Sequence, residues 1–311
     1  MQPEPAGTVG MSAGDLWDIA KRAALAWWND NVSRLGASLS YYTLFSLAPM
    51  LVIAIAIAGF VFGAEAARGE IVSQIQGLVG REGARAVQAM LQGAAKRSSG
   101  IVATIVGLVT LVVGATGVFL ELQTALNGIW RVKPKPSAGI MDVLRQRLIS
   151  FGLVVGVGFL LLVSLLVSAA LAALGKFLGS YMPGYAVLGQ ALNVLLSLAV
   201  ITLLFAMIYK VLPDVELAWR DVWVGGLVTA GLFSIGKLVI GLYLGTSSTT
   251  STYGAAASVI VLLLWVYYSS QIVLLGAEFT RAYVDRCGRR PPPMAHATRN
   301  NQPEALKEPG R

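Results

Sequence analysis

Six long stretches of this chain carry no charged residue, and this spacing of charges constrains the fold more than any other feature. Charged residues make up only 13% of the chain, against about 25% in a typical soluble domain. A helix that crosses a bilayer needs about 20 mostly apolar residues. The charge-free stretches are Leu35–Ala64, Ser98–Leu120, Leu148–Gly175, Phe177–Tyr209, Val222–Gly236 and Leu238–Ala277. The sequence therefore predicts a polytopic membrane protein and excludes the soluble globular and fibrous classes.

Turn signals within these stretches give the number of spans. Gly179, Pro183 and Gly184 interrupt the start of one stretch, and the polar run Thr246–Thr252 divides the last two spans. The stretches are continuously apolar, whereas barrel strands alternate in polarity. We therefore expect an all-α bundle of six transmembrane helices with amphipathic interfacial helices. The expected spans are residues 36–63, 98–120, 148–175, 187–209, 222–244 and 255–280.

The distribution of lysine and arginine predicts the orientation. If both termini lie on one side, that side holds 17 of the 24 basic residues, against 6 on the other, and Lys237 lies within a span. Cytoplasmic loops carry such an excess. Both termini are therefore expected in the cytoplasm. The net charge of +8 follows from this topology, and no nucleic-acid partner is expected.

Four segments outside the spans complete the predicted organisation. Residues 12–34 form an amphipathic helix in which Ser12 and Asp15 resemble a capping box. This helix either lies in the membrane interface or packs on the cytoplasmic ends of the bundle. Residues 64–97 are expected outside the cell as two short amphipathic helices with Gly77 and Gly80 between them, which cap a cavity, lie on lipid or simply connect two spans. Residues 1–11 and the basic tail 282–311, from about Arg289, are expected to be disordered.

The composition also limits the chemistry. The chain has one histidine, His296, and one cysteine, Cys287, which is too few for zinc, haem or iron–sulfur ligation. No nucleophile–base pair or acidic cluster can be built from the spans. We therefore expect no enzyme activity, no cofactor and no metal.

Two charges fall within the predicted spans, where charges are functional candidates. Lys237 lies about 22 Å into its span at 1.5 Å per residue, level with Asn193 or Gln190 of the fourth span. It either snorkels to the outer headgroups or faces a cavity and meets an anionic group. Glu278 lies at the inner interface, where it is expected to pair with Arg281 or a loop arginine and not with Lys237. Glu121 resembles Glu278 in its position.

Hydroxyl-rich stretches in two spans are candidates for a polar cavity. Pro49 is expected to kink the first span, and Tyr41, Tyr42 and Ser46 precede it. Tyr267 and Gln271 belong to a similar patch in the last span. These side chains either line a cavity or bond to backbone and neighbouring helices.

Four groups of residues resemble the YihY / virulence factor BrkB family. They are Ala37–Pro49, Leu122–Trp130, Leu212–Val222 with Gly225 and Gly226, and Tyr253–Ala255 with Leu264–Tyr267 and Leu275–Phe279. The resemblance covers about residues 15–285, and the four groups occur in the expected order. The resemblance implies a six-span bacterial inner-membrane protein with both termini inside and no established activity. The ribonuclease label once attached to the family is not expected to apply, because the cytoplasmic acids are scattered or paired with basic residues.

Two functional hypotheses remain open. The first is a transporter or translocator of a lipid, an amphiphile or an anionic solute, which rests on Lys237 and on the hydroxyl-rich first span. The second is a non-transporting scaffold for envelope proteins, which rests on residues 64–97 and the N-terminal helix. The expected partners are membrane lipids and either a second copy of the chain or an envelope protein.

Overall fold

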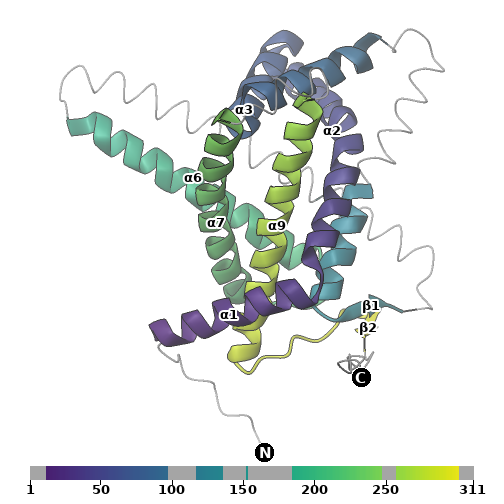
Figure 1. Ribbon diagram of the computed structural model, residues 1–311, viewed down its shortest axis with the longest axis vertical. Helices are drawn as coiled ribbons and strands as arrows, with labels where there is room; N and C mark the ends of the chain where they lie inside the picture. The colour runs from purple at the N-terminus through teal and green to yellow at the C-terminus, as the bar shows by residue number, and fades with distance from the viewer. Residues whose placement is uncertain (1–11, 97–116, 136–151, 153–183, 247–256, 301–311) are drawn as a thin grey trace, which may run out of the picture.

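The computed structural model describes residues 12–96, 117–135, 152, 184–246 and 257–300, and most of these residues are helical. The long helices α2 (Val32–Phe62), α7 (Trp219–Thr246) and α9 (Ala257–Arg286) run side by side, as Figure 1 shows. Helix α1 (Ala13–Asn29) crosses one end of this group and α3 (Ala64–Lys96) lies at the other. We call these the α1 end and the α3 end. The expected spans 98–120 and 148–175 lie almost wholly outside the described residues, as do residues 1–11 and 301–311.

Helix α1 begins at the capping box that its sequence predicts. The Ser12 side chain accepts a hydrogen bond from the backbone N–H of Gly14, and the Asp15 carboxylate accepts one from the backbone N–H of Ser12. A two-residue turn of Asp30 and Asn31 then joins α1 to α2, with Asn31 in the left-handed conformation at a φ of 52°. This turn sets the direction of α1 relative to α2.

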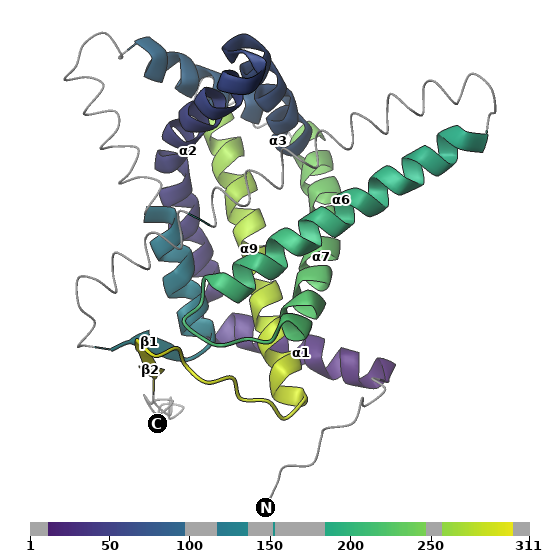
Figure 2. The ribbon, with the colours of Figure 1, turned by 180° about the vertical axis from the view of Figure 1, so that it is seen from behind.

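The main core lies where α6 (Gly184–Val211), α7, α9 and the helical residues 117–129 meet near the α1 end. Phe205, Tyr209, Val222 and Leu274 are among its buried side chains. Figure 2 shows α6 crossing the bundle obliquely, with its N-terminal half extending beyond the other described helices. Among the described residues three helices are long and apolar enough to cross a membrane, at Val194–Val211, Trp219–Ile240 and Val259–Arg286.

The segment after α2 differs from its expectation. It was expected to form two short helices, but Ala64–Lys96 is one helix of 33 residues, α3. Val87 and Leu91 of α3 are buried with Ile55 of α2 and Leu262 of α9. A glycine inside a helix costs about 0.5–1 kcal/mol relative to alanine. Burial of large apolar side chains, at about 1.5–3 kcal/mol each, is enough to keep the helix continuous through Gly77 and Gly80.

The C-terminal segment corrects the prediction of disorder from Arg289. We call residues 287–300 the C-terminal strap. Strand β2 (Ala297–Arg299) pairs antiparallel with β1 (Val132–Pro134), and Pro293 forms a bridge with Val215. The N–H of Glu216 donates to the carbonyl of Pro292, and the N–H of Met294 donates to the carbonyl of Asp214. Prolines lack a donor but keep their carbonyls, so the strap is ordered by hydrogen bonds to two loops that composition does not reveal.

Candidate functional site

A buried aspartate, Asp214, joins three segments at the α1 end. It lies in the loop between α6 and α7, and only 2% of it is exposed. Its carboxylate accepts hydrogen bonds from Nε2 of Gln123 at 3.1 Å and from Nδ2 of Asn127 at 2.7 Å, and Nε2 of His296 lies 3.1 Å away. The Asp214 N–H donates to Oδ1 of Asn127 at 2.8 Å. A buried carboxylate must be satisfied in this way, so Asp214 holds the loop between α6 and α7, the helical residues 117–129 and the strap together.

Ion pairs extend this connection to α1 and α9. Nη2 of Arg131 lies 2.6 Å from Oδ1 of Asp30, at the end of α1. Nη1 of Arg281 lies 3.7 Å from Oδ2 of Asp30 and donates to the carbonyl of Ile129 at 2.8 Å. Arg289 of the strap pairs with the buried Asp221 of α7. Burial lowers the pKa of Arg289, but the neighbouring Asp221 carboxylate outweighs this and raises the pKa overall.

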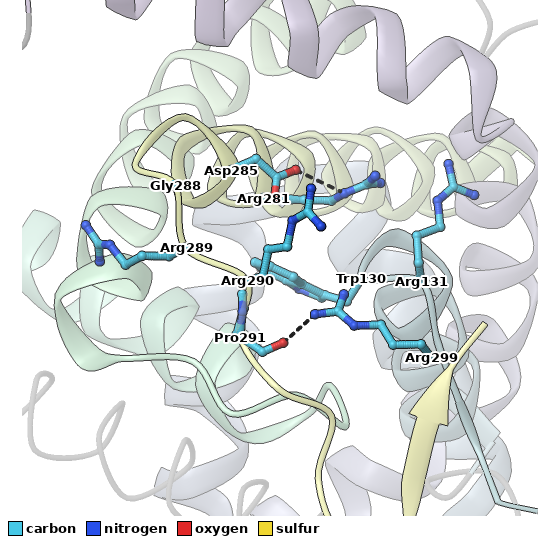
Figure 3. Close-up of a pocket in the computed structure, with 9 residues that line it drawn as sticks. All are labelled: Trp130, Arg131, Arg281, Asp285, Gly288, Arg289, Arg290, Pro291 and Arg299. Carbon is cyan, nitrogen blue, oxygen red and sulfur yellow. Dashed lines mark hydrogen bonds and ion pairs between the residues drawn. The ribbon is translucent and has the colours of Figure 1, made fainter. Parts of the chain in front are cut away.

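Between these segments lies a pocket of about 750 Å³, which Figure 3 shows. Five arginines contribute to it, together with one carboxylate and the buried indole of Trp130. The lining residues are Trp130, Arg131, Arg281, Asp285, Gly288, Arg289, Arg290, Pro291 and Arg299. Figure 3 shows Arg290 and Arg299 beside Trp130 and Arg281 next to Asp285, whereas the Arg289 side chain points away from them. We call this cavity the arginine pocket.

The arginine pocket keeps an excess of positive charge. Arg131, Arg281 and Arg289 are each paired with a carboxylate. Within the described part of the chain, neither Arg290 nor Arg299 has a carboxylate partner, and Arg299 donates to the carbonyl of Pro291 at 2.7 Å. Guanidinium groups bind phosphate and carboxylate through paired hydrogen bonds. The pocket therefore suits an anionic group, and the described residues contain no cluster of histidine, cysteine or acidic side chains that would hold a metal.

Glu278 lies near Arg281 of the pocket and is 1% exposed. Its Oε2 is 3.9 Å from Nη1 of Arg281, the residue with which it was expected to pair. Its carboxyl group also faces that of Asp30, and neither of its oxygens accepts a hydrogen bond from any described residue. The buried acid thus belongs to the charge group that joins α1 to α9, and Lys237 is not part of it.

The predicted cavity residues of the first span belong to α2, and that they line a cavity stays a prediction. Tyr41 is 58% exposed and contacts the ring of Phe45. Tyr42 is exposed as well, whereas Ser46 is buried and donates to the carbonyl of Thr43 at 3.1 Å. Pro49 lies within the continuous helix α2. None of these residues lines the arginine pocket.

The remaining candidates belong to α7, α9, α6 and the helical residues 117–129. Lys237 is exposed on α7, beside the exposed side chains of Leu238 and Val239. Tyr267 is half-buried in α9, and Oε1 of Gln271 accepts a hydrogen bond from Nε1 of Trp27 at 3.1 Å. Glu121 accepts a hydrogen bond from Ser38. Asn193 and Gln190 belong to α6, and their side chains lie outside the described residues.

The sequence did not single out the arginines that line the pocket. Arg131, Arg289, Arg290 and Arg299 were counted there only as topology signals. The feature of the sequence that could have indicated these arginines is the basic, proline-rich character of two segments, around Pro134 and around Pro291. The pairing of β1 with β2, together with the bridge of Pro293 to Val215 and the ion pair of Arg289 with Asp221, brings these segments together.

Comparison with known proteins supports a single family across the chain. The family model described as virulence factor BrkB matches residues 23–301. A UPF0761 membrane protein of Ralstonia nicotianae is 32% identical over 84% of this chain and 59% of its own length. UPF0761 membrane proteins of Rhodospirillum centenum and Verminephrobacter eiseniae are 32% and 33% identical, over 57% and 58% of their lengths. The chain thus spans a little under three fifths of these relatives, and no solved structure matches it.

Proposed function

This chain is a membrane protein of the virulence factor BrkB family, and on that premise we propose that it translocates an anionic lipid, amphiphile or solute across the bacterial inner membrane. In this proposal six helices span the membrane and the α1 end faces the cytoplasm. The excess of arginine at that end supports the orientation. The protein acts without enzymatic chemistry, cofactor or nucleic acid.

The arginine pocket is the observation that carries the proposal. It lies at the ends of α9 and of residues 117–129. In the proposed orientation this is the cytoplasmic membrane surface, where the pocket would bind an anionic group that enters or leaves the bilayer. Arg290 and Arg299 are the two pocket arginines without a carboxylate partner among the described residues. A basic pocket at the cytoplasmic end of membrane helices suits a phosphate-bearing headgroup. A free anion carries the same chemistry, so the experiment must separate the two sources.

Purified protein in vesicles tests the proposal in two arms. One arm measures the movement of a fluorescent phosphatidylglycerol between leaflets, and the other measures the release of trapped radiolabelled phosphate. The wild type is expected to exceed protein-free vesicles in one arm. The double variant R290Q/R299Q should lower that rate about tenfold or more, because hydrogen bonds to charged groups contribute about 1.5–3 kcal/mol each and 1.4 kcal/mol corresponds to tenfold.

Two variants serve as controls in the same assay. Arg34→Gln removes an exposed arginine outside the pocket and should keep the wild-type rate. Lys237→Met removes the charge that the sequence favoured, and its exposure among apolar side chains predicts a rate within about twofold of the wild type, since a lysine can snorkel there. Rates equal to those of protein-free vesicles in both arms would refute translocation.

The alternative proposal is a scaffold that docks envelope proteins and transports nothing. Helix α3 presents Glu65, Arg68 and Gln76 as exposed polar residues at the α3 end. In this case, crosslinking in cells from position 68 should trap one defined protein, and the vesicle assay should show no movement. Recovery of the chain alone would count against the scaffold.

A further inference from the structure

Helix α1 carries an apolar face that the described protein does not cover. Ile19 and Ala23 are buried against Phe279 of α9. Trp17 and Trp28, on the other side, are 72% and 74% exposed. At 3.6 residues per turn, Ala20, Ala24, Trp17 and Trp28 lie within about 80° of one another. Two large indoles exposed on the same face of a short helix need a covering environment.

The contacts of α1 with α9 show which of its sides faces the membrane. Trp27 donates to Gln271, whereas the carboxylate of Asp15 lies 2.6 Å from Nη2 of Arg286. Gln271 precedes Arg286 by 15 residues, about 22 Å along a helix. Since α9 runs from the α3 end to the α1 end, Gln271 lies nearer to the middle of the bilayer. The Trp27 side of α1 is therefore the side that faces the membrane.

The polar and apolar residues of α1 also lie on opposite sides of the helix. Asp15, Asp18, Arg22 and Asn29 lie within about 60° of one another on the side away from Trp27. The Trp17 and Trp28 face adjoins the Trp27 side. Lys21 lies next to Trp28 around the helix, where its ammonium group can reach lipid phosphates while its stem stays on apolar surface.

From this arrangement we infer that the face of α1 formed by Trp17, Ala20, Ala24 and Trp28 is inserted into the headgroup–acyl boundary of the leaflet at the α1 end. Tryptophan is enriched at that depth because its ring is apolar and its N–H is polar. Amphipathic helices of this kind lie in the plane of the interface. Helix α1 thus contacts the bundle by one face and the bilayer by another. The inference rests on the chain being a membrane protein and not on translocation.

Site-directed fluorescence tests the depth of this face in the full chain. Cys287, the single cysteine, is first replaced by alanine. Bimane is then attached at W17C, W28C or N29C, and the protein is reconstituted in vesicles. Both tryptophans are largely exposed, so their replacement should leave the fold intact. Position 29 is the matched control, since it is exposed and adjacent to position 28 but on the polar side.

Two quenchers distinguish the occupants of the face. Phospholipid brominated near the top of its acyl chains should quench bimane at positions 17 and 28 at least threefold more than at position 29, and aqueous iodide should show the reverse order. Iodide quenching at positions 17 and 28 as strong as at position 29 would overturn the inference. Protection of positions 17 and 28 from both quenchers would also overturn it, because a second copy or another protein would then cover the face.

Discussion

The Nδ2 of Asn127 donates a hydrogen bond of 2.7 Å to Oδ2 of Asp214, although the two residues are 87 positions apart. Oδ1 of Asn127 accepts from the Asp214 backbone N–H at 2.8 Å, so a single side chain engages the aspartate twice. Asn127 and Asp214 belong to two separate stretches that resemble the family. Their pairing holds the helical residues 117–129 against the loop between α6 and α7 at the α1 end.

Replacement of Asn127 by leucine should destabilise the protein strongly. The variant loses both hydrogen bonds and leaves a buried carboxylate with fewer partners, which we expect to cost about 2–4 kcal/mol. The free energy of unfolding in detergent, measured by denaturant titration, checks this value. Thr124→Ala on the same helical segment is the control, because Thr124 is exposed and should change stability by less than about 0.5 kcal/mol. Equal effects of the two variants would show that the hydrogen bonds between Asn127 and Asp214 do not stabilise the protein.

The C-terminal strap should be protected from hydrogen exchange. Its N–H groups at Met294, Ala297 and Asn300 donate to carbonyls, and exchange of bonded amides requires local opening. In the variant Arg289→Gln the strap loses its ion pair with Asp221, and exchange of residues 291–300 should become about tenfold faster or more. Mass spectrometry of that peptide measures it. Exchange of the wild-type peptide at the rate of an unstructured chain would instead support the disorder that composition predicts.

The contact between α6 and α7 should depend on the absence of a side chain at Gly226. A Cβ added there would lie 2.7 Å from the carbonyl oxygen of Thr202 and 3.0 Å from the N atom of Ala206. Backbone atoms cannot rotate away, so Gly226→Ala should cost about 1–3 kcal/mol. Gly231→Ala in the same helix meets no atom within 4 Å and should be neutral or stabilising by up to about 1 kcal/mol. The thermal unfolding temperature should therefore fall in Gly226→Ala and stay the same or rise in Gly231→Ala.

The ion pair between α1 and α9 should lose its contribution to stability at acid pH. The Arg286 guanidinium, together with the backbone N–H of Ser12, holds the pKa of Asp15 below its ordinary value of 3.8. A lowered folded-state pKa means that the contribution is complete above pH 3.8 and disappears as the pH falls through the lowered pKa. Asp15→Asn should therefore destabilise the protein at neutral pH, and its difference from the wild type should shrink below pH 3.8.

Two further measurements test the origin of this effect. High salt should reduce the Asp15→Asn difference, because the pair is near the surface and is screened. Asp18→Asn is the control, since Asp18 is exposed and has no ion pair within the described residues. A difference between Asp15→Asn and the wild type that stays constant from pH 7 to pH 3 would exclude the ion pair as its cause.

The elements that follow from local rules could be predicted well. The capping box of α1 depends on residues three positions apart, and the apolar length of α7 and α9 is visible in the spacing of charges. The continuous helix α3 could not be predicted, because glycines weaken a helix locally while its packing on α2 and α9 depends on the other helices. The candidate site was not predicted either. In the sequence, Arg131 and Arg299 differ in no way from the other basic residues that indicate orientation, and nothing shows that they lie close together.

The sequence by itself determined that this protein belongs in a membrane, because long stretches without charge cannot be covered in water by so few polar residues. It also determined, through the density of lysine and arginine, which segments gather at one end. Only the tertiary structure decided what those basic residues do there. Asp30 and Asp221 pair with Arg131, Arg281 and Arg289, whereas Arg290 and Arg299 have no carboxylate partner in the part of the chain that the structure describes. The interaction between two charges depends on their separation in space. The number of residues between them in the sequence therefore does not show which charges are neutralised.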